Sequence, residues 1–269
     1  MSVAHYENFP VASRLVTGAL RPAVVAIYQF ARSADDIADE SNAPPAVRIA
    51  RLDACGATLD RIERGEEATE PPFVALAAAI REHGLPIGPL RDLLSAFRQD
   101  VLKQRYATYA ELLDYCSRSA NPIGCLMLHL YGVSGVENRR RADAICTGLQ
   151  LANFWQDIAA DWERGRVYLP AEDLAQFSVD AAQIAAGRCN ARWTRLLAFE
   201  VERARAWLET GRPLAGALPL RLALELKLVV AGGLRVLRAI DAAKGDVFRH
   251  RPRLGAMDWP VLVVAALRR

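Results

Sequence analysis

Apolar residues recur along this chain with the three- and four-residue spacing of helices, and the alternation typical of strands is rare. The pattern predicts ten helices, which cover residues 21–40, 45–65, 71–83, 87–104, 109–131, 138–163, 178–186, 190–209, 214–243 and 257–268. We expect Pro122 and Gly124 to break the fifth helix, and residues 164–170 to form a loop. No linker rich in serine or glycine divides the chain, so the pattern indicates one all-α domain, residues 1–269.

Local signals support individual helix ends. Thr108 and Glu111 have the spacing of a capping box, which predicts a helix that begins at residue 109. Pro22 suits the first turn of the first helix, and Gly65 suits the end of the second. These signals come from side chains at the ends of the apolar pattern, so they support the helical interpretation independently of it.

Composition places the 269-residue chain among globular proteins, with 52% hydrophobic and 24% charged residues. A net charge of +3 is too small to indicate a nucleic-acid partner. The first 30 residues lack the layout of a signal peptide, and no apolar run approaches a membrane span, so we expect a cytoplasmic protein. The five cysteines and four histidines lack the spacing of zinc ligands, and phosphate-binding glycine motifs are absent.

Two groups of carboxylates follow apolar helical stretches. Asp35 and Asp39 follow residues 23–34, and Asp157 and Asp161 follow residues 149–155. Each pair is spaced i and i+4, so its members lie on one helix face, where like charges destabilise a helix by a few tenths of a kcal/mol. Burial would raise this cost steeply unless a cation lies close by. The pattern therefore indicates a counter-cation at each group.

Each group also extends a polar stripe along its helix. The first stripe comprises Tyr28, Arg32, Asp35 and Asp39. The second comprises Gln150, Asn153, Asp157 and Asp161. Two facing helices of this kind favour a diphosphate bound through Mg²⁺, with Mn²⁺ as an alternative, because hard cations take oxygen ligands. Solvated helix ends are the simpler interpretation, and a di-iron bundle would need Glu-x-x-His motifs that the chain lacks.

Further residues suit a diphosphate pocket. Arg164, Arg166 and Tyr168 directly follow the second stripe and could neutralise phosphate oxygens, although a solvated basic loop would look the same. Tyr115 and Asn121 flank the predicted helix break, where exposed backbone dipoles could orient a cation or water, although a packing kink would also explain the break. Four aromatic residues are typical of a core, and some suit the lining of a carbocation cavity: Phe9, Phe30, Phe154 and Trp155.

Taken together, segments 26–40, 106–116 and 149–170 resemble the squalene/phytoene synthase family of head-to-head prenyl synthases, and the resemblance covers nearly the whole chain. It implies a single-domain isoprenoid-synthase helical bundle with a central cavity, Mg²⁺ and prenyl diphosphate substrates. The resemblance places these residues on the first diphosphate side: Tyr28, Arg32, Asp35, Asp36 and Asp39. It places these on the other side: Tyr115, Gln150, Asn153, Asp157, Asp161, Arg166 and Tyr168.

Several positions depart from the family pattern. Glu7 stands in a slot that is usually basic, Gln156 replaces an arginine before the second aspartate motif, and Leu234 replaces the tyrosine of a Tyr-Arg pair. With residues 5–13 and 119–124, these departures are similar to the hydroxysqualene synthase branch of bacterial hopanoid biosynthesis. That branch implies conversion of presqualene diphosphate and water to hydroxysqualene and diphosphate, with no need for NADPH.

The residue roles follow from these two lines of argument. Candidate catalytic residues are Tyr28, Arg32, Tyr115, Asn121, Gln156, Arg166 and Tyr168, of which Asn121, Gln156 and Tyr115 are candidates to place the water. Candidate substrate-binding residues are Phe9, Arg32, Gln150, Asn153, Arg164 and Arg166. Candidate metal ligands are Asp35, Asp36, Asp39, Asn153, Asp157 and Asp161.

Two other functions stay open at this stage. The chain could be a complete squalene or phytoene synthase that condenses two prenyl diphosphates, or a non-catalytic assembly subunit with the same fold. Residues 258–269 have an apolar body and a basic end, so they suit either a docked terminal helix or peripheral contact with the inner face of a membrane. Enzymes of the same pathway are further expected partners.

Overall fold

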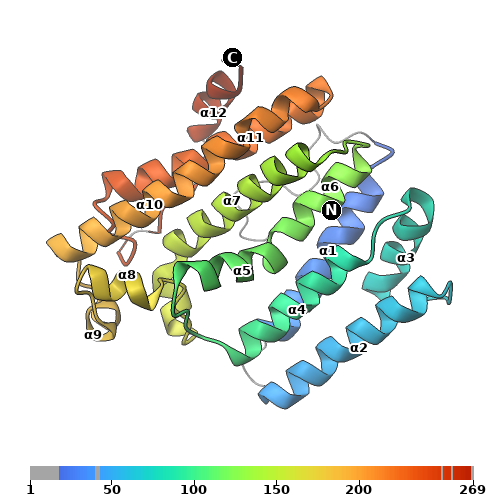
Figure 1. Cartoon of the computed structure of the whole chain (residues 1–269), viewed down its shortest axis with the longest axis horizontal. Helices are drawn as coiled ribbons and strands as arrows, with labels where there is room; N and C mark the ends of the chain where they lie inside the picture. Colours follow the sequence, from blue (N-terminus) through green and yellow to red (C-terminus); the bar gives the residue numbers. More distant parts are fainter. Residues whose placement is uncertain (1–17, 40–42, 250, 256, 268–269) are drawn as a thin grey trace. The chain divides into compact units, whose positions relative to one another are not determined.

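The computed structural model describes residues 18–39, 43–249, 251–255 and 257–267, and the regular elements of these residues are helices joined by turns and loops (Figure 1). The helices are α1 (Arg21–Asp39), α2 (Pro45–Glu63), α3 (Pro71–His83), α4 (Gly88–Leu102), α5 (Tyr109–Ser119), α6 (Asn121–Leu130), α7 (Val136–Glu163), α8 (Ala171–Gln176), α9 (Ala181–Ala185), α10 (Ala191–Gly211), the 3₁₀ helix η1 (Arg212–Ala217), α11 (Leu220–Ala242) and α12 (Asp258–Leu267). Within those ranges, β pairing is limited to an isolated bridge between Arg105 and Val167. The all-α prediction is confirmed.

Most predicted helices are present, and the differences have local causes. The predicted break lies at Ala120, between α5 and α6, because Pro122 suits the first turn of a new helix. The helix expected near 178–186 is present in shortened form as α9, and a short helix that was not predicted, α8, precedes it. Asp180 is the N-cap of α9, because its side chain accepts a hydrogen bond from the backbone N–H of Gln183. A 3₁₀ helix, η1, precedes α11, so the helix predicted from 214 begins at Leu220.

The chain divides into two compact units. The first unit comprises residues 1–103 and 118–139. Its helix α1 packs on α2, α3 and α4, and α4 packs on both α2 and α6. Phe30 of α1 meets Phe73 of α3 edge to face, with ring centroids 5.6 Å apart. The apolar face of α1 thus forms the centre of this unit, which leaves its polar stripe toward the unit's edge.

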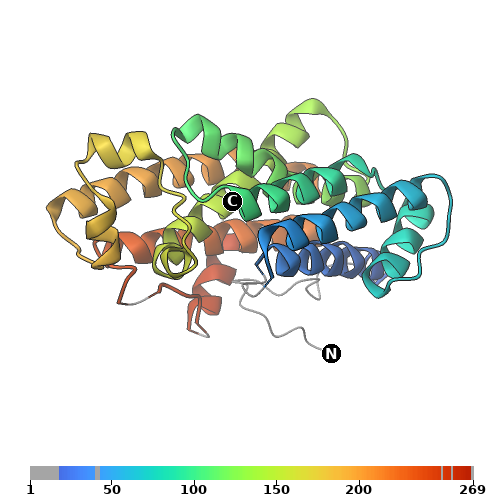
Figure 2. The same ribbon diagram turned by 90° about the horizontal axis from the view of Figure 1, so that it is seen from below.

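The second unit comprises residues 104–117 and 140–269. Its long helices approach closely at glycines: a Cβ added at Gly148 of α7 would lie 2.8 Å from Leu208 Cγ of α10, and one at Gly211 would lie 2.7 Å from the Arg141 carbonyl oxygen. Helix α11 packs on α10, η1 and α12. The short α8 and α9 lie together at one end of this unit (Figure 2). In the described part of the chain, no helix combines the length and apolarity that a membrane crossing requires.

A buried charged cluster connects α8 and α10 of the second unit. Glu200 and Asp173 are both buried, and Arg203 donates to Asp173 at 2.7 Å and lies 3.6 Å from Glu200. The Arg203 guanidinium also stacks over the ring of Tyr109 at 4.1 Å. Burial and the neighbouring Asp173 carboxylate raise the pKa of Glu200 to about 8, and Arg203 opposes this shift only in part. Glu200 is therefore protonated in the folded protein at neutral pH.

We predict that Glu200 makes the unit less stable as pH rises. Since the folded pKa lies above the usual value of 4.5, its stabilising contribution is complete below pH 4.5 and is lost as pH rises to about 8. The free energy of unfolding, measured in urea across this range, should therefore fall less in Glu200→Gln than in the unaltered protein. Glu202→Gln, at an exposed position on the same helix, is the matched control and should keep the original slope. Equal slopes in all three proteins would contradict this assignment.

Candidate active site

The first carboxylate stripe lies on α1 and carries its own cation. Arg32 Nη2 lies 2.7 Å from Asp36 Oδ1, and Arg32 Nη1 donates to Asp35 Oδ2 at 3.3 Å. Both carboxylates are more open than the sequence pattern indicates, with 37% and 57% of the Asp35 and Asp36 side chains exposed. Helical geometry puts Tyr28, Arg32, Asp35 and Asp39 on one face, as predicted. Asp35 and Asp36 are therefore paired with Arg32 and still keep accessible carboxylate oxygens.

The end of α1 is held by the start of α2. Arg48 Nη1 donates to the carbonyl oxygen of Ala38 at 2.7 Å, which satisfies one of the backbone acceptors that a helix end leaves open. Ala38 is fully buried, whereas the neighbouring Asp39 is half-buried. This contact fixes the direction in which α1 ends and so positions the last aspartate of the stripe.

The second stripe lies on α7, and an arginine from far along the chain binds it. Arg251 donates through Nε to Asp157 Oδ1 and through Nη2 to Asp157 Oδ2, the latter at 2.8 Å. Both side chains are about three-quarters buried, at 25% and 26% exposed. A two-pronged arginine–carboxylate contact is among the stronger ion pairs in proteins. Elsewhere on the stripe, Gln150 and Asp161 are half-buried and Asn153 is exposed.

Gln156 and Pro252 make a second contact between the same segments. Gln156 is buried, and its Nε2 donates to the Pro252 carbonyl oxygen. Together with the Arg251–Asp157 pair, this contact clamps residues 251–255 onto α7. The sequence reasoning missed Arg251. The signal that could have indicated it is the run Arg249, Arg251 and Arg253 after α11, which would supply the counter-cation that Asp157 requires.

The loop after α7 is fixed by segment 104–107. The Val167 backbone N–H donates to the Gln104 carbonyl at 2.9 Å, and Arg105 donates to the Gly165 carbonyl. Gly165 adopts a φ of +80°, which favours glycine and turns the chain out of α7. Arg164 is exposed, and Arg166 is half-buried with its backbone N–H on the Asp161 carbonyl at 2.7 Å. The two arginines therefore stand on a rigid loop directly after the second stripe.

The predicted capping box of α5 is present in altered form. The Glu111 backbone N–H donates to Thr108 Oγ1 at 3.2 Å, as expected. The Glu111 carboxylate accepts from the Ala107 backbone at 2.6 Å instead of from Thr108. Glu172 of α8 accepts from the Tyr109 backbone, also at 2.6 Å. Two acidic side chains thus accept hydrogen bonds from backbone N–H groups at the start of α5. These bonds hold segment 104–107 in place against the loop.

Aromatic rings form a packed cluster beneath that loop. Tyr168 stacks on Phe154 of α7, with centroids 3.8 Å apart and planes 11° apart. Tyr115 of α5 lies 6.0 Å from Tyr168 and 6.1 Å from Phe154, and Tyr106 lies 5.6 Å from Tyr115. All four rings are buried. The structure therefore brings Tyr115 and Tyr168 together as predicted, in a cluster whose rings pack on one another.

Three further predicted residues lie on α6, α7 and α1: Asn121, Trp155 and Phe30. Asn121 is half-buried at the first position of α6, in the first unit. Trp155 is fully buried and donates through Nε1 to the Glu200 backbone carbonyl at 3.1 Å, and Phe30 is likewise a core residue. Phe9, predicted to bind substrate, and Glu7 lie outside the described residues. The roles assigned to individual site residues stay predictions.

The oxygen ligands suit a metal that the substrate helps to hold. Among the residues with described positions, no three carboxylate, histidine or cysteine groups converge on one point. Mg²⁺ commonly binds through one or two carboxylates together with water and substrate phosphates, so it does not need such a cage. Asp35 and Asp36, close together and accessible on α1, carry oxygen atoms that could bind a metal in this way.

We predict strong energetic coupling between Arg251 and Asp157. In metal-free buffer, a double-mutant cycle of Arg251→Gln and Asp157→Asn should give a coupling of about 1–3 kcal/mol in the free energy of unfolding, because the pair is largely buried. The control cycle uses Arg249→Gln and Asp246→Asn, since Arg249 is 80% exposed and 3.6 Å from its partner. That pair should couple by less than about 0.5 kcal/mol. Similar values for both cycles would show that Arg251 does not clamp its segment.

Comparison with known proteins agrees with this geometry. The family model described as squalene/phytoene synthase matches residues 3–258. A hydroxysqualene synthase from Rhodopseudomonas palustris is 36% identical over 97% of this chain and 88% of its own length, and a phytoene synthase from Mycobacterium tuberculosis is 31% identical over 97% and 86%. The crystal structure of squalene synthase HpnC from Alicyclobacillus acidocaldarius is 42% identical, with a TM-score of 0.83 over 89% of this chain and 90% of that one. The chain belongs to the squalene/phytoene synthase family.

Proposed function

We propose that this chain converts presqualene diphosphate and water into hydroxysqualene and inorganic diphosphate. Family membership makes it a head-to-head prenyl synthase relative with prenyl diphosphate substrates. The observation that carries the finer proposal is Gln156: where the family pattern has an arginine, this chain buries a neutral amide that binds the Pro252 carbonyl. A site without that charge suits one diphosphate better than two. The hydroxysqualene synthases among the relatives, at 32–38% identity, support the same activity.

In the proposed reaction, the bond between the substrate carbon and the bridging oxygen breaks, and the electron pair leaves with the diphosphate. Mg²⁺ held by the aspartates would neutralise the leaving group. Arg166, on the rigid loop after α7, and Arg32, beside Asp35 and Asp36, would donate to phosphate oxygens as charge develops. The Arg32 side chain is held by the two carboxylates and the backbone of Arg166 by the Asp161 carbonyl before substrate arrives, so little reorganisation of α1 or of the loop is needed.

The cyclopropylcarbinyl cation then rearranges, and the oxygen of one water attacks carbon and releases a proton. Three residues are candidates to place that water: Asn121, Gln156 and Tyr115. Because the Gln156 amide nitrogen already donates to Pro252, we assign Gln156 to hold residues 251–255 on α7. Asn121, half-buried with an amide at a helix start, is then the preferred candidate, and buried Tyr115 is the second.

A complete condensing synthase is the second candidate function. Three relatives favour it: the Alicyclobacillus structure is named a squalene synthase, and two mycobacterial phytoene synthases are 31% identical over 97% of the chain. Such an enzyme would make its product from farnesyl or geranylgeranyl diphosphate alone. Substrate choice therefore separates the two proposals without any assumption about individual residues.

The first test gives the purified enzyme and Mg²⁺ one substrate at a time. We expect consumption of presqualene diphosphate to an alcohol, and no presqualene diphosphate or squalene from farnesyl diphosphate, with products identified by mass spectrometry. Addition of NADPH should leave the alcohol as the product, because water ends the reaction. Condensation of farnesyl diphosphate, or diversion to squalene by NADPH, would support the second candidate instead.

The second test concerns the carboxylates. Asp35→Asn and Asp157→Asn should each lower turnover of presqualene diphosphate by roughly 10³-fold or more, because each removes a charge that would bind the metal–diphosphate complex. Asp92→Asn, at an exposed carboxylate on α4, is the matched control and should keep full activity. Circular dichroism should show the helical content unchanged.

Arg251→Gln separates two effects of the Asp157 change, since it removes the ion pair but keeps the carboxylate. Its activity should exceed that of Asp157→Asn at saturating Mg²⁺. Near-normal turnover in Asp35→Asn or Asp157→Asn would contradict the assignment of these residues to the metal.

A further inference from the structure

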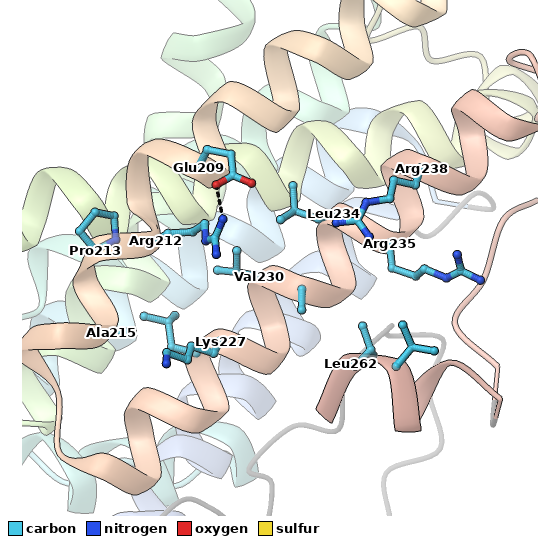
Figure 3. A pocket seen from close by; sticks show the side chains of 13 residues that line it. Glu209, Arg212, Pro213, Ala215, Lys227, Val230, Leu234, Arg235, Arg238 and Leu262 are labelled. Atoms are coloured by element: carbon cyan, nitrogen blue, oxygen red, sulfur yellow. Dashed lines mark hydrogen bonds and ion pairs between the residues drawn. The ribbon is translucent and has the colours of Figure 1, made fainter. Parts of the chain in front are cut away.

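The second unit contains a groove with a volume of about 360 Å³, lined by residues of α10, η1, α11 and α12 (Figure 3). None of its lining residues belongs to the carboxylate stripe of α7. Its floor and walls are mainly aliphatic: Leu226, Val230, Leu234, Val261 and Leu262. Leu234 stands where the family pattern has a tyrosine, so this part of α11 is more apolar than the pattern implies. The groove is thus an apolar surface that the proposed reaction does not use.

Cations surround this apolar surface. The groove is lined by Arg212, Lys227, Arg235 and Arg238 and by one carboxylate, Glu209, which leaves a net charge of +3. Arg212 donates to Glu209 at 2.7 Å, and Arg235 donates to Asp258 of α12 at 2.8 Å. Within the described chain, Lys227 and Arg238 have no carboxylate partner. Figure 3 shows both among the side chains that line the groove.

Helix α12 adds an exposed apolar face next to these cations. Leu262 and Ala266 are buried and dock the helix on α11. Trp259 and Val263 lie on one side of α12 and Val261 and Val264 on another, and these four residues keep between 38% and 52% of their surface exposed. Exposed aliphatic and aromatic side chains on consecutive turns of one helix are uncommon on a surface that faces water. Together with Lys227 and Arg238, these four side chains of α12 form what we call the α11–α12 surface.

We propose that the α11–α12 surface docks on a bilayer of anionic phospholipids. Lys227 and Arg238 would contact lipid phosphates, while Trp259, Val261 and Val264 enter the boundary between headgroups and acyl chains. An apolar helix face beside unpaired cations is the pattern of interfacial membrane binding. Protein interfaces, in contrast, are usually depleted of lysine, which favours the bilayer over a protein partner. The proposal concerns binding and stands whether or not the proposed reaction is correct.

The cations are tested by sedimentation with vesicles. We expect the protein to bind vesicles that contain phosphatidylglycerol, to stay in solution with vesicles of phosphatidylcholine alone, and to be released as salt rises. Lys227→Gln combined with Arg238→Gln should weaken vesicle partition by roughly 30-fold, because that is the contribution expected of two basic residues at an anionic membrane surface. The matched control is Arg192→Gln with Arg195→Gln, exposed arginines at the other end of α10, and it should change partition less than about threefold.

The helix face is tested by a second pair of variants. Trp259→Ser with Val264→Ser should lower partition to the same vesicles, whereas Val47→Ser with Val74→Ser, also exposed and aliphatic, should not. Brominated lipids should quench tryptophan fluorescence in the unaltered protein and much less in Trp259→Phe.

Three results would overturn the proposal: equal binding to neutral and anionic vesicles, no binding to either, or equal loss in test and control pairs. A second pattern would identify a protein partner instead. In that pattern an acidic protein abolishes vesicle binding, and brominated lipids quench tryptophan fluorescence neither in the unaltered protein nor in Trp259→Phe.

Discussion

Carboxylates stacked on one face of an apolar helix require a cation, and arginines supply it at both stripes of this chain. Arg32 pairs with Asp35 and Asp36 within α1, whereas Arg251 reaches Asp157 from 94 residues away. The two solutions have different consequences. The first pairing is made within a single helix, and the second makes the position of residues 251–255 depend on the charge of α7.

This dependence gives the replacement of an arginine by Gln156 a structural meaning. A second cation beside Asp157 would stand next to Arg251, and like charges that are largely buried repel strongly. The neutral amide instead donates to the Pro252 carbonyl and strengthens the same clamp. The substitution thus removes a charge from the site and adds a contact to the segment that covers α7, which is how one residue can change both substrate choice and local structure.

Much of the fold and part of the site could be predicted from the sequence, because they depend on local spacing. Helical periodicity located α1 and α7, the i, i+4 spacing placed Asp35 with Asp39, and the capping signal placed the start of α5. Contacts between distant segments left no such signal. Arg251 on Asp157, and Arg203 between Glu200 and Asp173, depend on how loops return across the helices. The exposure of Asp36 could not be predicted either, since a residue near a helix end can face solvent even where its neighbours are buried.

The proposed function requires water to attack a carbocation that forms by loss of diphosphate. The decisive measurement is the reaction of presqualene diphosphate in ¹⁸O-labelled water, with both products examined by mass spectrometry. We expect label in the alcohol and none in the inorganic diphosphate, because the bond between carbon and oxygen breaks. Label in the diphosphate with an unlabelled alcohol would mean attack at phosphorus and no carbocation.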